Sequence, residues 1–150
     1  MQIASNVLFT IHFGLLGAWS GFALNAAAVV RTVMMFARSC GKRWAGKPFA
    51  LGFMISICAI AGFATYDGWK TLLIIVAMIA STLGLWIGSS NWIRYSMFVS
   101  SPLWLIYNAI VGSISGAVTE TFNLISIAIF FIRMAFERKN KKLKEEAKEK

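Results

Sequence analysis

The sequence predicts an all-α membrane protein, a polytopic transmembrane bundle of about six helices. Hydrophobic residues make up 58% of the 150 positions and charged residues only 14%, too few to cover a soluble domain of this size. Between Ile3 and Phe136 the sequence contains just two acidic residues, Asp67 and Glu120. The apolar residues fall into six runs, which are too many and too long for a signal peptide followed by a globular domain.

Small, polar and basic residues set the boundaries between these runs. Ser20 and Gly21 turn the chain after the first run. A basic loop at 39–48 follows the second, and a tight Asp67-Gly68 turn follows the third. Several runs hold about 16–18 residues, slightly fewer than the roughly 20 that span a bilayer, so we expect tilted helices or local thinning. The expected spans are residues 3–18, 22–38, 49–66, 71–88, 97–111 and 117–136.

Three later segments leave alternatives open. Residues 89–96 are either an interfacial loop or the start of the fifth helix. Pro102 lies early enough to occupy the first turn of that helix or to kink it. After a transmembrane domain over 1–136, the basic tail 137–150 carries seven basic and four acidic residues. This tail is expected to be a solvated helix or a disordered segment.

The distribution of basic residues predicts the orientation. With six spans, the 39–48 loop, Arg94 and the tail fall on one side of the membrane, whereas Lys70 alone falls on the other. The positive-inside rule therefore makes both termini cytoplasmic. The net charge of +9 comes mainly from basic residues at the ends of apolar spans, which membrane topology explains. We therefore expect the lipid bilayer as a partner and no nucleic acid.

An internal repeat relates the two ends of the chain. Residues 11–38, shifted by 95 positions, align with residues 106–133 and share a small-residue corner and a basic stop. This pattern predicts a parallel repeat, with halves at about 5–38 and 71–136 and a linker helix at 49–66. The fourth span has no counterpart, so the first three-helix bundle is expected to be incomplete. An upstream helix, or self-association into a homo-oligomer, would complete it. The matched pairs are Gly17 with Gly112, Ser20 with Ser115, Gly21 with Gly116, Asn25 with Glu120, Phe36 with Phe131 and Arg38 with Arg133.

A second pattern extends over nearly the whole chain. Its residues are His12-Phe13, Leu16-Gly17, Arg31-Thr32, Arg94, Trp104, Tyr107-Asn108, Gly112-Ser113, Gly116, Glu120 and Arg133. In these residues the chain resembles the YgjV family of small bacterial inner-membrane proteins, whose members carry an additional N-terminal helix. The resemblance implies a location in the bacterial inner (plasma) membrane. It also implies an architecture similar to the SWEET, PQ-loop and PnuC transporters, which join two three-helix bundles by a linker helix.

Polar residues inside the apolar spans form the candidate site, because such residues are costly in hydrocarbon unless they face protein or water. Glu120, Asn123 and Ser126 recur every three residues along the sixth helix. Asn25 and Arg31 lie on the matched stripe of the second helix, and two facing stripes would suit a zwitterionic or multiply hydroxylated solute. The candidate substrate-binding residues are Asn25, Arg31, Trp104, Tyr107, Asn108, Glu120, Asn123 and Ser126.

Several residues inside the spans also have a purely structural interpretation. Glu120 is either a site residue or a first-turn acid that the positive helix N-terminus favours. Arg31 either pairs with Glu120 or extends to the cytoplasmic interface. His12 and Asn108 more often hydrogen-bond a neighbouring group than bind a substrate. Gly84 and Gly88 are a candidate for close helix approach.

Two functions are compatible with these sequence features. The first is a small-molecule transporter or facilitator with a polar site between the repeats. The second is a non-transporting accessory or structural membrane protein, whose polar groups only hold helices together. We expect no enzyme, because one histidine and one buried acid do not form a nucleophile–base or metal constellation. We also expect no cofactor.

Overall fold

The computed structural model describes residues 2–46 and 48–146, and this part of the chain is helical without a strand. The predicted all-α fold with about six helices is confirmed for these residues. A short 3-10 turn, η1 (Arg43–Gly46), follows the second helix. The six helices are α1 (Gln2–Leu15), α2 (Trp19–Ser39), α3 (Pro48–Ala64), α4 (Trp69–Ile87), α5 (Ser90–Ile110) and α6 (Ile114–Glu146).

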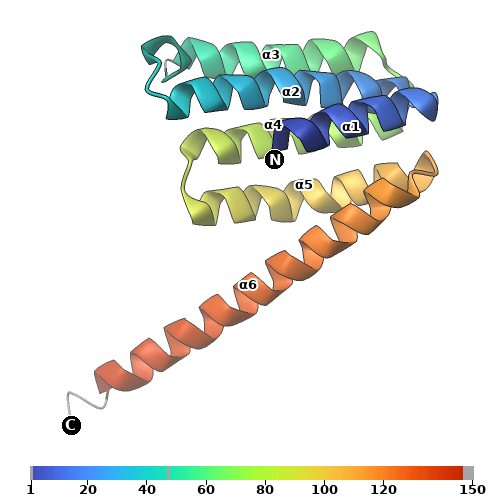
Figure 1. The fold of residues 1–150 in the computed structure, drawn as a ribbon. Coiled ribbons are helices and arrows are strands. Elements are labelled where there is room, and N and C mark those ends of the chain that lie inside the picture. The colour runs from blue at the N-terminus through green and yellow to red at the C-terminus, as the bar shows by residue number, and fades with distance from the viewer. Residues whose placement is uncertain (1, 47, 147–150) are drawn as a thin grey trace.

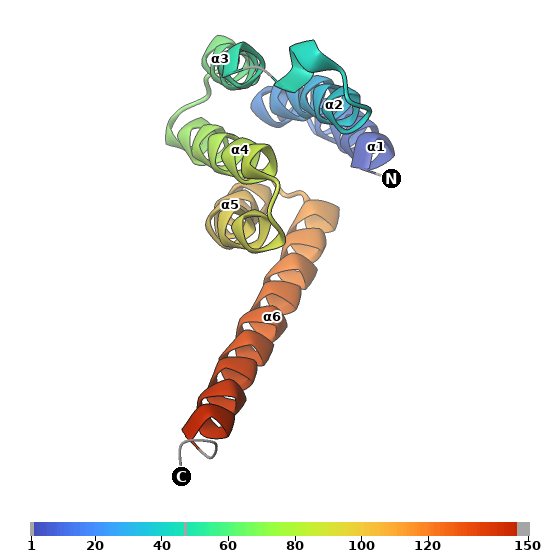
Figure 2. The same cartoon turned by 90° about the vertical axis from the view of Figure 1, so that its left-hand side faces the viewer.

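Five helices run side by side, and the sixth leaves them at an angle (Figures 1 and 2). Helix α2 packs against α1, α3 and α4, α4 packs against α5, and α6 packs mainly against α5. Figure 1 shows the α1–α2, α3–α4 and α5–α6 corners at one end of the bundle. η1, the α4–α5 corner and the far end of α6 lie at the other end, as an antiparallel succession of helices requires.

Among the described residues, three helices are long and apolar enough to cross a membrane: Trp19–Ser39, Trp69–Ile87 and Ile114–Glu137. α1 and α3 are shorter apolar helices. The expectation of spans of about 16–18 residues is wrong for α2 and α4, which have 21 and 19 residues, and α5 has 21 residues where a span over 97–111 was expected. α2 and α5 are longer because each begins upstream of its expected span.

The corner between α1 and α2 lies slightly earlier than expected. Ser20 and Gly21 belong to α2, and Gly17 turns the chain with a φ of 70°. Gly112 does the same between α5 and α6 with a φ of 72°. A positive φ disfavours any residue with a Cβ atom, so glycine just past the end of a helix stops it there.

The hydrogen bonds of these two corners also match at the 95-residue offset. In each corner the residue after the glycine donates its N–H to a carbonyl five residues back, the bond typical of a Schellman motif. The next helix then begins at the second residue after the glycine. The corresponding bonds are Ala18 N to Phe13 O (3.0 Å) and Ser113 N to Asn108 O (2.9 Å), and Phe22 N to Ala18 O (3.0 Å) and Ala117 N to Ser113 O (3.0 Å).

The helix boundaries decide the alternatives that the sequence left open for residues 89–96, for Pro102 and for the tail. Residues 90–96 start α5, and the Ser89 hydroxyl caps it by accepting a hydrogen bond from Trp92 N at 3.3 Å. Pro102 lies in the interior of α5 rather than in its first turn. The tail continues α6 as a helix to Glu146, while residues 147–150 lie outside the described part of the chain.

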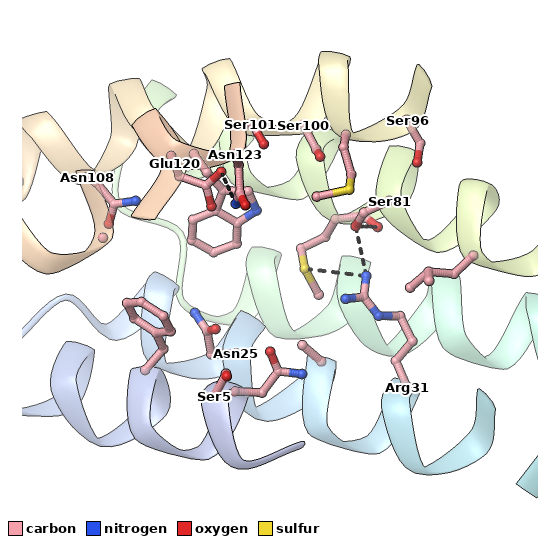
Figure 3. Close-up of a pocket in the computed structure, with 18 of the residues that line it drawn as sticks. Ser5, Asn25, Arg31, Ser81, Ser96, Ser100, Ser101, Asn108, Glu120 and Asn123 are labelled. Carbon is pink, nitrogen blue, oxygen red and sulfur yellow. Dashed lines mark hydrogen bonds between the residues drawn. The ribbon is translucent and has the colours of Figure 1, made fainter. Parts of the chain in front are cut away.

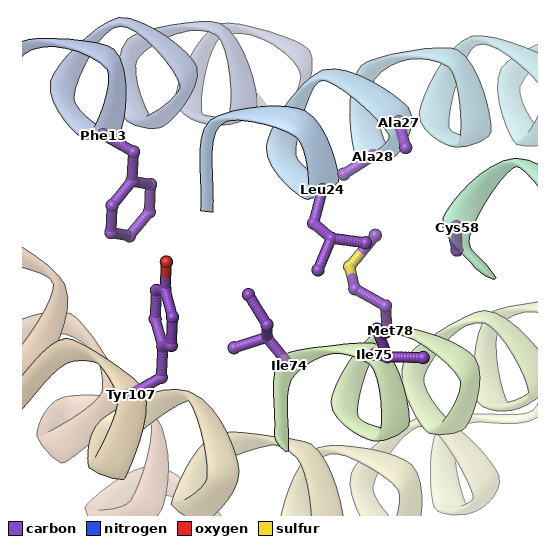
Figure 4. Close-up of a cluster of buried hydrophobic side chains, with 9 residues drawn as sticks. All are labelled: Phe13, Leu24, Ala27, Ala28, Cys58, Ile74, Ile75, Met78 and Tyr107. Carbon is purple, nitrogen blue, oxygen red and sulfur yellow. The ribbon is translucent and has the colours of Figure 1, made fainter. Parts of the chain in front are cut away.

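The main apolar core joins α1, α2, α4 and α5, with Cys58 from α3 (Figure 4). A Cβ atom at Gly84 would collide with Ser96, so the predicted close approach is confirmed for Gly84 in the α4–α5 contact. Gly88 instead ends α4 as its C-cap. The buried residues of this core cluster are Phe13, Leu24, Ala27, Ala28, Cys58, Ile74, Ile75, Met78 and Tyr107.

Candidate functional site

A cavity of about 630 Å³ lies between α1, α2, α4, α5 and α6. Its polar lining consists of five serines, four asparagines, one arginine and one glutamate. Phe9, Phe13 and Trp104 contribute aromatic surface. A cavity that combines apolar and aromatic surface with convergent polar groups is typical of small-molecule sites.

Six of the eight candidate residues line this cavity. They come from three helices, so the structure brings together side chains that are up to 98 positions apart, from Asn25 to Asn123. Figure 3 shows Asn25 and Glu120, the pair matched by the repeat, on opposite sides of the cavity. Whether these residues bind a substrate stays a prediction. The six are Asn25, Arg31, Trp104, Asn108, Glu120 and Asn123.

The other two candidates lie elsewhere. Tyr107 is 1% exposed in the apolar core, and its hydroxyl accepts a hydrogen bond from Gly21 N at 2.9 Å. Ser126 is exposed on α6. A helix turns about 100° per residue, so two three-residue steps from Glu120 rotate Ser126 by about 120° away from it. A stripe with this spacing therefore leaves the cavity wall before it reaches Ser126.

Arg31 adopts neither of the two expected arrangements. It is 6% exposed, and its Nη1 donates to Ser81 Oγ at 2.8 Å (Figure 3). The same atom donates to Thr82 Oγ1 at 3.1 Å. No described residue forms an ion pair with it, so it neither pairs with Glu120 nor extends to an interface. Two hydroxyls of α4 lie within reach and hold the guanidinium inside the bundle.

Glu120 lies beyond the first turn of α6. This helix begins at Ile114, and no acidic residue lies in its first turn, so the interpretation as a first-turn acid is wrong. The carboxylate accepts a hydrogen bond from Asn123 Nδ2 at 3.2 Å, and Ser101 of α5 is a second hydrogen-bond partner. Figure 3 shows this group at the cavity wall, apart from Arg31.

His12 and Asn108 behave differently from each other. His12 Nε2 lies 2.9 Å from Ser113 Oγ and 3.1 Å from Ser115 Oγ, which confirms that it bonds neighbouring hydroxyls. Asn108 is 2% exposed and lines the cavity, and its Oδ1 has no hydrogen-bond partner among the described residues. An unpaired buried acceptor is costly, so Asn108 is a better site candidate than the sequence indicated.

The sequence interpretation missed six polar lining residues. One signal was present: Ser96, Ser100, Trp104 and Asn108 recur every four residues along α5, and this spacing places them on one helix face. Ser81 and its neighbour Thr82 stand in an otherwise apolar run with no helical repeat of polar residues, so no pattern marked Ser81. The missed residues are Ser5, Asn6, Ser81, Ser96, Ser100 and Ser101.

In the described residues, no three histidine, cysteine or acidic side chains are grouped so that they could hold a metal ion. What the cavity offers is hydrogen-bond donors and acceptors together with one positive and one negative side chain. This chemistry suits reversible binding of a polar solute.

Long apolar helices around a polar cavity define a helical membrane protein. The sequence matches the Imp-YgjV family, described as bacterial inner membrane protein, over residues 1–138. The chain therefore belongs to this family, which places it in the bacterial inner membrane in contact with the lipid bilayer. No curated protein and no solved structure matches it.

Proposed function

We propose that this protein is a small-molecule transporter or facilitator, and that its substrate site is the cavity between α1, α2, α4, α5 and α6. The observation that carries the proposal is the polar lining of this cavity within apolar helices. Charged and amide side chains inside a membrane protein generally face a bundle interior or a water-filled cavity and mark solute pathways. The substrate on this proposal is a small polar solute.

Contacts between the two corners support the same proposal. His12 and Tyr107 are matched at the 95-residue offset. His12 reaches the α5–α6 corner at Ser113 (2.9 Å), while Tyr107 reaches the α1–α2 corner at Gly21 (2.9 Å). Such an exchange is expected when two copies of a unit face each other across an approximate two-fold axis. In transporters built from parallel repeats, the substrate site lies at the interface between the repeats, and a SWEET-like architecture would place it there.

The orientation is part of the proposal. Arg43 and Arg94 belong to the end of the bundle with η1 and the start of α5, whereas Lys70 starts α4 at the opposite end. We propose six membrane crossings with the Arg43 end and both termini in the cytoplasm. Lys42→Cys and Lys70→Cys test this in a chain whose two free cysteines, Cys40 and Cys58, are replaced by alanine. An impermeant thiol reagent added outside should label the Lys70 variant alone, and the reverse labelling contradicts the orientation.

Glu120 provides the direct test of the site. Glu120→Gln is expected to abolish ligand-dependent thermal stabilisation and uptake into proteoliposomes across a panel of polar metabolites, while expression and insertion stay unchanged. Asn25→Ala should weaken both signals. Thr121→Val is the matched control, because Thr121 is exposed and, among the described residues, its hydroxyl bonds only the Ala117 carbonyl of its own helix. If Glu120→Gln behaves like the control, the cavity is not the substrate site.

The burial of α6 favours one alternative, a non-transporting accessory protein. Only 11% of the residues in an 18-residue apolar stretch of its candidate span are buried within the chain, and Phe122 and Phe136 are 69% and 62% exposed. A helix that leaves its own bundle can pack against another membrane protein. In that case no metabolite in the panel should stabilise the purified chain.

A further inference from the structure

Arg31 carries a charge that no described acidic side chain neutralises. Its hydrogen bonds among the described residues all come from Nη1, to the hydroxyls of Ser81 and Thr82 and to the sulfur of Met78. Its Nε is buried without a partner in this part of the chain. A guanidinium presents five N–H donors, and burial of an uncompensated charge is strongly destabilising. Arg31 also lines the cavity, so an anionic group of a ligand would supply the missing partner.

We propose that Arg31 binds the carboxylate of a zwitterionic solute, whose ammonium group binds at Glu120 and Trp104. This inference rests on the proposed function and narrows its substrate to one chemical class. The planar guanidinium fork matches a carboxylate and can bind it through two parallel hydrogen bonds.

The opposite charge of the solute has its own partners. Glu120 is the acidic residue among those that line the cavity. Trp104 lies on α5 one turn after Ser101, which bonds the Glu120 carboxylate. An ammonium group at this place meets a carboxylate and an indole side chain, and both kinds of group attract cations.

The charge balance of the cavity selects a zwitterion over other polar solutes. Arg31 and Glu120 are the charged residues of the lining and they do not pair with each other. A neutral polyol leaves both charges without a counter-charge, and a simple anion leaves Glu120 without one. A zwitterion compensates both while adding no net charge to a low-dielectric site.

The test measures thermal unfolding of the purified full chain in detergent with the standard α-amino acids, β-alanine, γ-aminobutyrate and glycine betaine. Each is compared with the matched amine or amino alcohol that lacks the carboxylate, and with sorbitol and inositol. We expect at least one zwitterion to raise the unfolding midpoint and its matched amine to leave it unchanged. Arg31→Gln should weaken that zwitterion's affinity about 10- to 100-fold, the usual worth of charge-assisted hydrogen bonds.

Two further variants make the result specific. Arg31→Lys keeps the positive charge but not the fork, so it should retain weakened zwitterion binding even where Arg31→Gln fails to fold. Arg38→Gln removes a guanidinium of the same helix that stacks on Trp86 at 4.2 Å and donates to its carbonyl at 2.7 Å. Arg38 does not line the cavity, so this variant should bind as the wild type does.

Each other outcome has a defined meaning. No stabilisation by any zwitterion, equal stabilisation by the matched amines, or wild-type affinity in Arg31→Gln overturns the inference. Stabilisation and uptake of polyols alone overturns it but leaves the proposed function standing. Arg31-dependent zwitterion binding without uptake into proteoliposomes supports the inference and overturns the transporter proposal.

Discussion

The α1–α2 and α5–α6 hairpins share one corner geometry but differ in how they pack. α2 is enclosed by α1, α3 and α4, and 44% of the residues in an 18-residue apolar stretch of it are buried. α6 contacts mainly α5 and diverges from the bundle (Figure 2), so only 11% of the residues in the corresponding stretch of α6 are buried. The same local turn is therefore compatible with a central helix and with a peripheral one.

The two corners also satisfy the same backbone N–H differently. Gly21 and Gly116 are each the third residue of a helix, where the N–H has no partner within the helix. Gly116 N donates to the Ser113 hydroxyl of its own corner at 3.3 Å. Ala18, at the position matched with Ser113, has no hydroxyl, and Gly21 N donates to Tyr107 of the other hairpin instead. The first corner thus depends on a long-range contact that the second does not need.

The largest difference between the corners is expected at these two glycines. In Gly21→Ala the new Cβ would lie 2.9 Å from the Phe13 ring and 3.0 Å from the Tyr107 hydroxyl, both held in a packed core. Overpacking of this kind should lower the free energy of unfolding by about 3 kcal/mol. In Gly116→Ala the Cβ collides with Asn108, which lines the cavity and can turn into it, so we expect a smaller loss of stability together with weaker ligand binding. SDS titration of the two purified variants measures the loss of stability in each. Equal losses would contradict the expected difference between the two corners.

A smaller effect is expected when the contact between the corners is removed. Tyr107→Phe keeps the ring but leaves the buried Gly21 N–H without an acceptor, which should cost about 2 kcal/mol. Tyr95→Phe is the control, because Tyr95 lies on the same helix and is 41% exposed. If the two variants unfold at the same SDS fraction, the α1–α2 corner does not depend on Tyr107.

The smallest effect should be identical in both corners. A Cβ atom at Gly17 or Gly112 meets nothing within 4 Å, so alanine there adds only the strain of a positive φ, about 1 kcal/mol. Gly52→Ala is the matched control: its Cβ also meets nothing, and its φ is not positive, so it should be neutral or stabilising. Unequal losses of stability at Gly17 and Gly112 would show that the two corners differ in their surroundings despite their shared backbone geometry.

Features that depend on neighbouring residues were predictable from the sequence. Apolar runs and turn residues indicate six helices, because periodicity and glycine conformation are properties of short segments. The match between residues 11–38 and 106–133 predicted in addition that the two corners are alike and that Asn25 and Glu120 lie toward one space. This prediction came from comparing two distant segments with each other, not from neighbouring residues. The α1–α2 corner was expected a few residues too late, because Ser20 and Gly21 are compatible with a loop turn as well as with the first turn of a helix.

Tertiary structure alone decided which groups meet. Nothing near Arg31 in the sequence marks Ser81 and Thr82 as its partners, because they lie on α4 and face it only after the helices have packed. The same holds for Tyr107, whose hydroxyl caps a helix 86 positions away, and for the angle at which α6 leaves α5. Partners, burial and helix angles depend on contacts between residues far apart in the chain, and a local sequence pattern carries no information about them.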